Sequence, residues 1–239
     1  ALGLMGSLGY YWRALMANLV MGWWFLRGLG RNGLRPPGGA VTGPPVLCVH
    51  GFLRNGTCMW GMRRALQQRG RPTRAVSMGR PLRRIQRYAP RLEAALRELV
   101  AAHPGEKIDV VAHSMGGLVL RLVLCQSPDL APSIGHIVTL GSPHHGTESA
   151  RGAWMLPETE QLAPGSAFLD RLPDFRTCAP GCEVTTLATE YDFIVFPKST
   201  SHFPGSRAVE IPRSSHPGLI TEREVIEHVA ELIAGRSSP

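Results

Sequence analysis

The chain has 239 residues, of which 44% are hydrophobic and 18% are charged. That length is enough to bury a full core within one domain, and the composition excludes a disordered or coiled-coil protein. The formal charge of +8 comes from 26 basic residues, all arginine except Lys107 and Lys198. Arginine suits phosphate, but net charge bears on association and not on fold. No aromatic-basic repeat accompanies it, so we expect no nucleic-acid partner.

The first thirty residues are largely apolar. Ala14–Leu26 is an uncharged run between Arg13 and Arg27. Thirteen helical residues span about 20 Å, which is shorter than a membrane-spanning helix. A basic start and a small-residue cleavage site are missing, so a signal peptide is not indicated. Three interpretations stay open: a helix docked on the core, an interfacial helix, and the remnant of a membrane anchor. The interfacial helix would place Trp12, Trp23 and Trp24 at the lipid boundary.

We expect residues 1–44 to be an extension and linker and residues 45–239 to be one domain. Six apolar segments indicate strands: Val46–Val49, Arg74–Met78, Ile108–Ala112, Ile134–Leu140, Val184–Thr189 and Ala208–Ile211. Four segments have helical character: Thr57–Arg69, Tyr88–Ala102, Met115–Gln126 and Thr221–Ala234. This alternation predicts βαβ units and an α/β fold, with a parallel sheet and helices on both faces. Residues 147–183 break the rhythm and are predicted to be a lid insertion.

One segment has the sequence pattern of a catalytic turn. The apolar strand Ile108–Ala112 runs through His113-Ser114-Met115-Gly116 directly into a helix. In such a tight turn the residues two before and two after the serine must be small, and Ala112 and Gly116 meet this need. The turn lifts Ser114 above the sheet at a helix N-terminus, where negative charge is favoured. The strand–turn–helix context therefore predicts a nucleophilic serine.

On these residues the sequence resembles the α/β-hydrolase superfamily, and more narrowly bacterial lipases and esterases with an Ala-His-Ser-Met-Gly turn. The likeness covers residues 45–235. Three further motifs support it: Val49-His50-Gly51-Phe52, the run from Gly141 to Thr147, and the run from Leu162 to Leu169. The resemblance implies an α/β-hydrolase fold with a mostly parallel sheet of about six strands. The insertion is shorter than a large lid domain, which leaves short- and medium-chain esters open as substrates.

A serine needs a base to take its proton, and the base needs an acid to orient it. In this fold the chain order is serine, acid, histidine. Asp192 follows the fifth strand and resembles the acid of the family, with Glu190 as the alternative; Asp170 and Asp174 lie in the insertion and are expected to be solvated. His216 lies between the last strand and the last helix, where the family has its catalytic histidine. His202 is the rival, but it precedes the sixth strand.

The oxyanion of an acyl intermediate needs two N–H donors. The backbone N–H of Met115 is one, and by resemblance Phe52 supplies the other, with Gly51 allowing close approach of the backbone. His50, His113, His144 and His145 are expected to shape the substrate-binding site, although we expect the ring of His113 itself to point away from the pocket and pack.

Five cysteines are present. Cys48 and Cys125 are expected to be buried thiols, whereas Cys178 and Cys182 are close enough to form a local disulfide. No second Cys/His pair completes a zinc site, and no third ligand accompanies His144 and His145. Secreted lipases of this kind often carry calcium, but its ligands do not map onto this chain. We expect no metal and no cofactor.

The predicted activity is hydrolysis of a carboxylic ester or lipid through an acyl-enzyme on Ser114. The alternatives are an acyltransferase, a thioesterase or amidase with the same triad, and a non-catalytic scaffold recruited to a membrane by residues 1–30. The expected location is bacterial, either secreted, periplasmic or membrane-associated, with the cytoplasm left open. Eight arginines between residues 69 and 91 favour an anionic membrane surface over DNA.

Overall fold

A computed structural model describes residues 41–153 and 157–235, together with Trp12, Leu15, Met16, Asn18, Leu19, Gly22 and Trp23. The rest of the N-terminal extension, including most of its linker, lies outside the described residues. None of the described helices is both long and apolar enough to cross a membrane.

Six strands form one sheet in the order β2-β1-β3-β4-β5-β6, and every pairing is parallel. They are β1 (Val46–Val49), β2 (Thr73–Val76), β3 (Ile108–His113), β4 (Ile134–Leu140), β5 (Glu183–Tyr191) and β6 (Arg207–Ser215). All six predicted strands are confirmed. The last two strands are longer than the apolar segments that predicted them. As a result, β5 ends directly before Asp192, the predicted acid.

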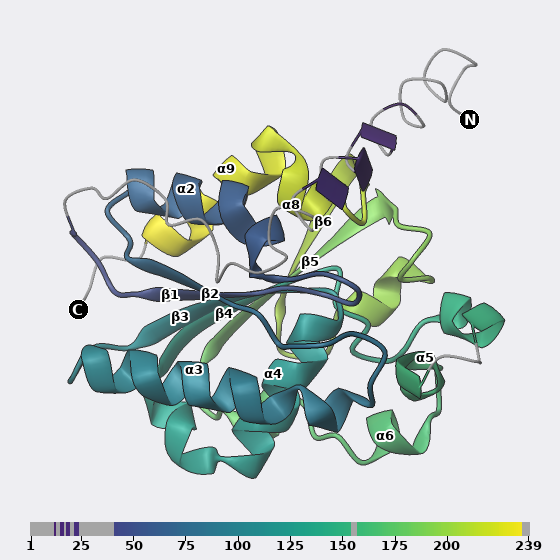
Figure 1. The fold of residues 1–239 in the computed structure, drawn as a ribbon, viewed down its shortest axis with the longest axis horizontal. Coiled ribbons are helices and arrows are strands. Elements are labelled where there is room, and N and C mark those ends of the chain that lie inside the picture. The colour runs from purple at the N-terminus through teal and green to yellow at the C-terminus, as the bar shows by residue number, and fades with distance from the viewer. Residues whose placement is uncertain are drawn as a thin grey trace.

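The helices cover both faces of the sheet, as predicted (Figure 1). One face carries α2 (Trp60–Gln68), α8 (Gly218–Thr221) and α9 (Arg223–Ala234); the other carries α3 (Ala89–Ala102) and α4 (Met115–Gln126). Alternate residues along the strands pack into two separate hydrophobic cores, one on each face of the sheet. Leu47 and Val49 pack with the α3 and α4 side, whereas Val46 and Cys48 pack with the α2 and α9 side. This is the pattern of strands buried on both faces.

Two predicted helices differ from the structure in detail. The segment Thr57–Arg69 begins as a 3-10 turn over Gly56–Met59, and only then becomes α2. The predicted helix Thr221–Ala234 begins at Arg223, because Glu222 before it has an extended backbone, and Gly218–Thr221 form a separate short helix that was not predicted. The break places the short helix α8 directly after the loop that carries His216.

The insertion contains α5 (Pro157–Leu162), α6 (Ala167–Asp170) and α7 (Phe175–Cys178), and residues 154–156 within it lie outside the described residues. It is held by polar contacts. Tyr88 donates to Glu158 Oε1 at 2.5 Å, and Ile85 N donates to Gln161 Oε1 at 2.7 Å. The buried guanidinium of Arg121, on α4, donates to the carbonyl of Leu172 at 2.7 Å. The insertion therefore lies against η2 (Ile85–Arg87), α3 and α4.

The cysteine predictions are partly wrong. Cys178 pairs with Cys125 in a disulfide that closes 53 residues of chain, and Cys182 is not in a disulfide. Cys125 is therefore not the buried thiol that its apolar helix face predicted. The reason is tertiary, because the insertion folds back and brings α7 against the end of α4. Cys48 is a buried thiol, as predicted, and burial raises its pKa to about 12.

Strand order also indicates where a site should lie. The chain leaves β1 for β2 at the sheet edge and returns past β1 to β3, so the loops after β1 and β3 diverge at this point. Ligands bind in open α/β sheets at such a switch, outside the carboxyl ends of the strands. Phe52 follows β1 and Ser114 follows β3. The fold therefore brings together the two loops that the sequence singled out.

Candidate active site

Ser114 occupies a strained turn between β3 and α4. Its backbone has φ 56° and ψ −131°, a left-handed φ that residues other than glycine rarely adopt. A Cβ added at Gly116 would lie 2.6 Å from the carbonyl oxygen of His50, and a Cβ at Gly51 would lie 2.7 Å from Ser114 Cβ. Only glycine fits these positions. The close packing of the loops after β1 and β3 holds the serine at the top of the sheet.

Asp192 and His216 form a buried acid–base pair. His216 Nδ1 lies 2.7 Å from Asp192 Oδ2, and both residues are about 95% buried. The second carboxylate oxygen, Oδ1, accepts the backbone N–H groups of Ile194 at 2.9 Å and Val195 at 2.7 Å. The carboxylate is thus fixed from its own loop and holds one ring nitrogen of His216, which leaves Nε2 as the nitrogen available for proton transfer.

The rival residues lie elsewhere. Glu190 is exposed. His202 is bonded through Nδ1 to Thr186 Oγ1 at 2.7 Å and through Nε2 to Glu210 at 3.2 Å, so both of its ring nitrogens are engaged between β5 and β6. Asp174 caps α7 by accepting the N–H of Thr177, and Asp170 is exposed in the insertion. The structure places none of these alternative acids and bases (Glu190, His202, Asp170 and Asp174) beside Ser114.

The loop after β1 is arranged to present an N–H group. Met78 N donates to His50 Nε2 at 3.0 Å, so the His50 proton is on Nδ1, which donates to the carbonyl of Gly51 at 2.8 Å. That carbonyl and the N–H of Phe52 belong to one trans peptide and point in opposite directions. Holding the carbonyl therefore fixes the N–H. Within the described part of the chain, neither Phe52 N nor Met115 N donates a hydrogen bond.

The side chains of His50 and His113 are both uncharged, and each one positions a neighbouring group of the site. Burial lowers the pKa of His50 to about 4. Burial, and next the nearby His216, hold the pKa of His113 well below its ordinary value. His113 Nε2 donates to the carbonyl of His216 at 3.1 Å, and the two rings lie 4.7 Å apart. His113 therefore packs under the base, as predicted for its ring, and it also lines the cavity beside Ser114.

The structure places His144 away from that cavity, which corrects its expected contact with substrate. Its Nε2 lies 3.1 Å from Thr139 Oγ1, and its ring packs edge-on against Phe175 and Phe203. Burial holds its pKa well below the ordinary value, ahead of the effect of Arg121. His144 is instead a packed core residue. The side chain of His145 is exposed.

A cavity of about 170 Å³ joins these groups. Its lining residues are Asn18, Phe52, Leu53, Arg54, His113, Ser114, Ile194, His216 and Pro217. No described residue of 147–183 lines it, although the insertion was expected to roof the site. One lining residue, Asn18, comes from the N-terminal extension. Sequence reasoning found no signal for Asn18 or Arg54.

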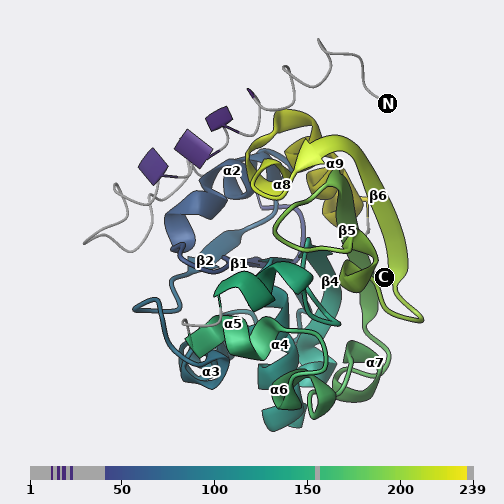
Figure 2. The same ribbon diagram turned by 90° about the vertical axis from the view of Figure 1, so that its right-hand side faces the viewer.

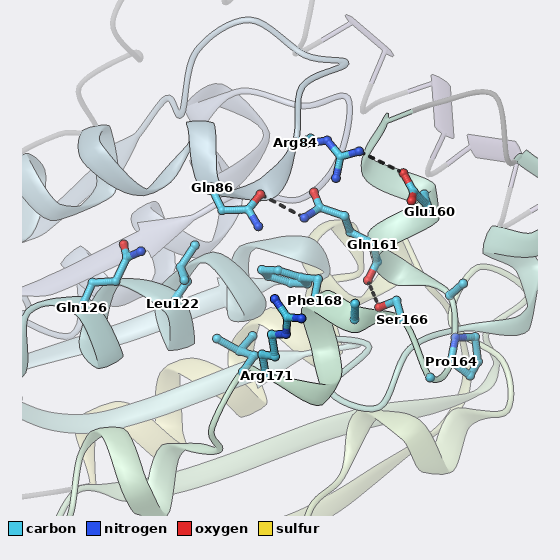
Figure 3. A pocket seen from close by; sticks show the side chains of 14 residues that line it. Arg84, Gln86, Leu122, Gln126, Glu160, Gln161, Pro164, Ser166, Phe168 and Arg171 are labelled. Carbon is cyan, nitrogen blue, oxygen red and sulfur yellow. Dashed lines mark hydrogen bonds and ion pairs between the residues drawn. The ribbon is translucent and has the colours of Figure 1, made fainter.

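A larger hollow, of about 580 Å³, lies apart from Ser114 between α4, α5 and α6 (Figure 3). Figure 3 shows that several polar groups on its rim are paired: Arg84 with Glu160, Gln86 with Gln161, and Ser166 with the carbonyl of Gln161. It contains none of the predicted site residues. It lies where the insertion contacts the rest of the domain.

Two supporting residues were missed as site residues, although both lie in the motif from Gly141 to Thr147. A Cβ at Gly141 would lie 3.0 Å from His216 Nδ1 and 3.2 Å from Asp192 Oδ2, and its φ is 55°. Thr147 Oγ1 accepts the N–H of Phe196 at 2.9 Å and donates to the carbonyl of Ile194 at 2.8 Å. The motif follows β4, and it thus positions the loop after the neighbouring strand β5. That loop carries Asp192 and is called the acid loop below. Among the described residues, no group of three or more His, Cys, Asp or Glu side chains is placed to hold a metal.

Comparison with known sequences finds related hydrolases. The pattern of a family described as a PGAP1-like alpha/beta domain matches residues 75–154, which include the serine turn. Triacylglycerol lipases of Pseudarthrobacter phenanthrenivorans and Burkholderia plantarii are each 30% identical over 46% of this chain. The matches cover 36% and 32% of those proteins, so the chain aligns with about a third of the length of these relatives.

Solved structures show the same architecture. The mature Bacillus licheniformis lipase BlEst2 superimposes with a TM-score of 0.67 at 18% identity, over 86% of this chain and 96% of that one. Aspergillus fumigatus lipase B gives a TM-score of 0.68 at 17% identity, over 86% of this chain and 56% of that one. At such identities the likeness establishes a shared fold.

Proposed function

We propose that this chain, which has the α/β-hydrolase fold, is a serine carboxylic-ester hydrolase of the lipase and esterase kind. Ser114 is the nucleophile, His216 the general base and acid, and Asp192 the group that orients His216. The observation that carries the proposal is the buried Asp192–His216 pair at 2.7 Å, whose histidine lines the same cavity as a serine in a strained strand–helix turn. The triacylglycerol lipase relatives support an ester or lipid substrate.

The reaction follows from the positions of these groups. His216 Nε2 takes the proton of Ser114 Oγ as the oxygen attacks the ester carbonyl carbon. The N–H groups of Met115 and Phe52 donate to the oxyanion that forms, and the dipole of α4 adds to their effect. The intermediate collapses, the alkoxide leaves with the proton from His216, and Ser114 keeps the acyl group. Water, deprotonated by His216, then attacks the acyl-enzyme and restores Ser114.

The direct test is a panel of p-nitrophenyl esters from acetate to palmitate, combined with a fluorophosphonate that labels activated serines. We expect hydrolysis of at least the shorter esters and a single mass increment on the peptide that contains Ser114. Added alcohol or amine would reveal any transfer of the acyl group to an acceptor other than water. A protein that hydrolyses none of the esters and takes no label would refute the proposal.

The N-terminal extension supports contact with a membrane surface as part of this function. Trp12, Leu15, Leu19 and Trp23 are helical residues with 62%, 50%, 57% and 48% exposure, and their spacing of three, four and four places them on one helix face. Figure 2 shows the described pieces of this segment (purple) at the outer edge of the molecule, on the side of α2. Tryptophan and leucine on one exposed face are typical of helices that lie in a lipid interface.

Charge complementarity supports an anionic lipid. Arg80, Arg83, Arg84 and Arg87 are exposed in the segment that follows β2. Because the strands are parallel, this segment leaves the same edge of the sheet as the turn at Ser114. Each basic residue near an anionic surface contributes about 1 kcal/mol of attraction. The apolar stripe and the arginines would then face one membrane together with the cavity mouth.

We expect the variant Trp12→Ala/Trp23→Ala to lose at least about 10-fold in partitioning onto phosphatidylglycerol-containing vesicles, because it removes both interfacial tryptophans. Sedimentation with vesicles measures this directly. Val41→Ser, which removes an apolar side chain that is 71% exposed outside the stripe, is the matched control and should bind like the parent. Equal binding of the parent protein to neutral and anionic vesicles would contradict the assignment.

A further inference from the structure

The charges of this chain are divided along its length. All 18 acidic residues lie at or after Glu93, whereas 15 of the 26 basic residues precede it. The formal charge is therefore +15 up to residue 92 and −7 from Glu93 to the end. A cation in the first part has to find any carboxylate partner in the second. Several do so, among them Arg71 with Asp109 and Arg74 with Glu98 at 2.5 Å.

Arg54 has no such partner. No ion pair or side-chain hydrogen bond is made by its guanidinium within the described residues, which include every acidic side chain of the protein. Arg54 nevertheless lines the cavity that contains Ser114 and His216, two residues beyond the oxyanion donor Phe52. It is half-buried, and burial lowers its pKa. Its charge also contributes to the low pKa of His113, directly beneath the base.

A half-buried cation without an anion loses hydration and gains no compensating ion pair. Its surroundings give it no anion either, because the nearby Cys58 is a buried thiol whose pKa is raised by burial to about 12. A guanidinium presents a planar fork of donors that matches phosphate oxygens. The missing counter-charge is therefore expected to arrive with the substrate.

We propose that the substrate is an acyl ester whose alcohol part carries a phosphate, and that Arg54 binds this phosphate beside the scissile ester. The inference rests on the proposed ester hydrolase activity and adds the class of its substrate. Arg54 is a specificity residue here, because it holds a charge that takes no part in bond making or breaking.

The rest of the cavity mouth suits the acyl part. Leu53 and Ile194 line the cavity and are 42% and 50% exposed, and Phe193 and Phe196 in the same acid loop are 67% and 57% exposed. An apolar mouth beside one cation matches an amphiphile with an acyl chain and one anionic group. Such a molecule could be a soluble phosphate ester or a lipid held in a membrane, and the two sources differ in how they are presented.

The experiment compares two substrates with the same acyl chain, octanoyl glycerol and octanoyl glycerol phosphate. Each is supplied as free monomer and, in a second arm, within neutral vesicles. The readout is the ratio of kcat/KM for the phosphate ester to kcat/KM for the neutral ester. We expect the parent protein to prefer the phosphate ester, and Arg54→Gln to lower the ratio at least about 10-fold, as loss of a charged hydrogen bond would. Arg54→Lys keeps the charge and should retain part of the preference.

Arg223→Gln is the matched control, because it removes one positive charge from an exposed site outside the cavity and outside the arginine segment proposed to face the membrane. It should leave the ratio unchanged, which separates local binding from the overall field of the protein. A preference seen with monomers identifies a soluble phosphate ester, and one seen only in vesicles identifies a lipid. An unchanged ratio in Arg54→Gln, or no preference in the parent, would overturn the proposal.

Failure of the proposed function itself gives a different result, since then neither ester is hydrolysed by the parent protein. A second measurement covers the case in which Arg54→Gln does not fold. Calorimetry with octyl phosphate and the Ser114→Ala protein should show binding that weakens as salt rises from about 0.05 to 0.5 M, because exposed charges are screened. No binding, or binding insensitive to salt, would count against a phosphate site.

Discussion

Replacement of Ser114 by alanine is expected to lower kcat for ester hydrolysis by about 10⁶-fold, the loss seen when a serine triad loses its nucleophile. In the proposed mechanism, the Oγ atom is the only atom of this residue that bonds to the substrate carbon. Alanine keeps the Cβ and experiences the same left-handed φ of 56°, so the backbone strain is unchanged. Initial rates with p-nitrophenyl butyrate, together with the thermal unfolding midpoint, measure the two expectations separately.

Ser142→Ala is the matched control for that experiment. Ser142 is fully buried in the loop after β4, and its Oγ has no hydrogen-bond partner among the described residues. Its loss should leave ester hydrolysis close to the parent value. If Ser114→Ala turned over the ester at the parental rate, or if Ser142→Ala caused the larger loss, Ser114 would not be the nucleophile.

Asp192→Asn is expected to lower kcat by about 10⁴-fold with little change in the fold. The carboxylate oxygen Oδ2 is 2.7 Å from His216 Nδ1 and fixes the tautomer that leaves Nε2 free to take the serine proton. An asparagine can turn its NH₂ group toward Nδ1, which stabilises the other tautomer and protonates Nε2. It also removes the negative charge that stabilises the imidazolium formed during the reaction. Rates at several pH values and circular dichroism test both points.

Glu190→Gln is the control that decides between the two acids raised by the sequence. Glu190 is exposed on β5, and Asp192 is buried against His216. We expect Glu190→Gln to retain most of the parental rate. The opposite ranking, with Glu190→Gln inactive and Asp192→Asn active, would move the acid to Glu190 and would require the acid loop to rearrange when substrate binds.

The sequence by itself determined the class of fold and the order of its elements. Hydrophobic periodicity is a local property, so the six strands and the four longest described helices, α2, α3, α4 and α9, could be predicted from their own residues. The turn at Ser114 was equally readable, because small residues at fixed spacing after an apolar strand are a local requirement. Helix ends were harder to predict, as at Glu222, whose extended backbone separates α8 from α9.

Only the tertiary structure decided which distant groups meet. It joined Cys178 to Cys125 instead of Cys182, packed His144 into the core, and left the described residues of the insertion outside the lining of the cavity that contains Ser114. It also placed Asn18 and Arg54, which has no carboxylate partner among the described residues, in the lining of the cavity that contains Ser114, and neither belongs to a motif. Such contacts depend on strand order and on how loops fold back across the sheet. The spacing of residues along the chain does not predict these contacts, because the partners are separated by tens of residues and meet only once the sheet has formed.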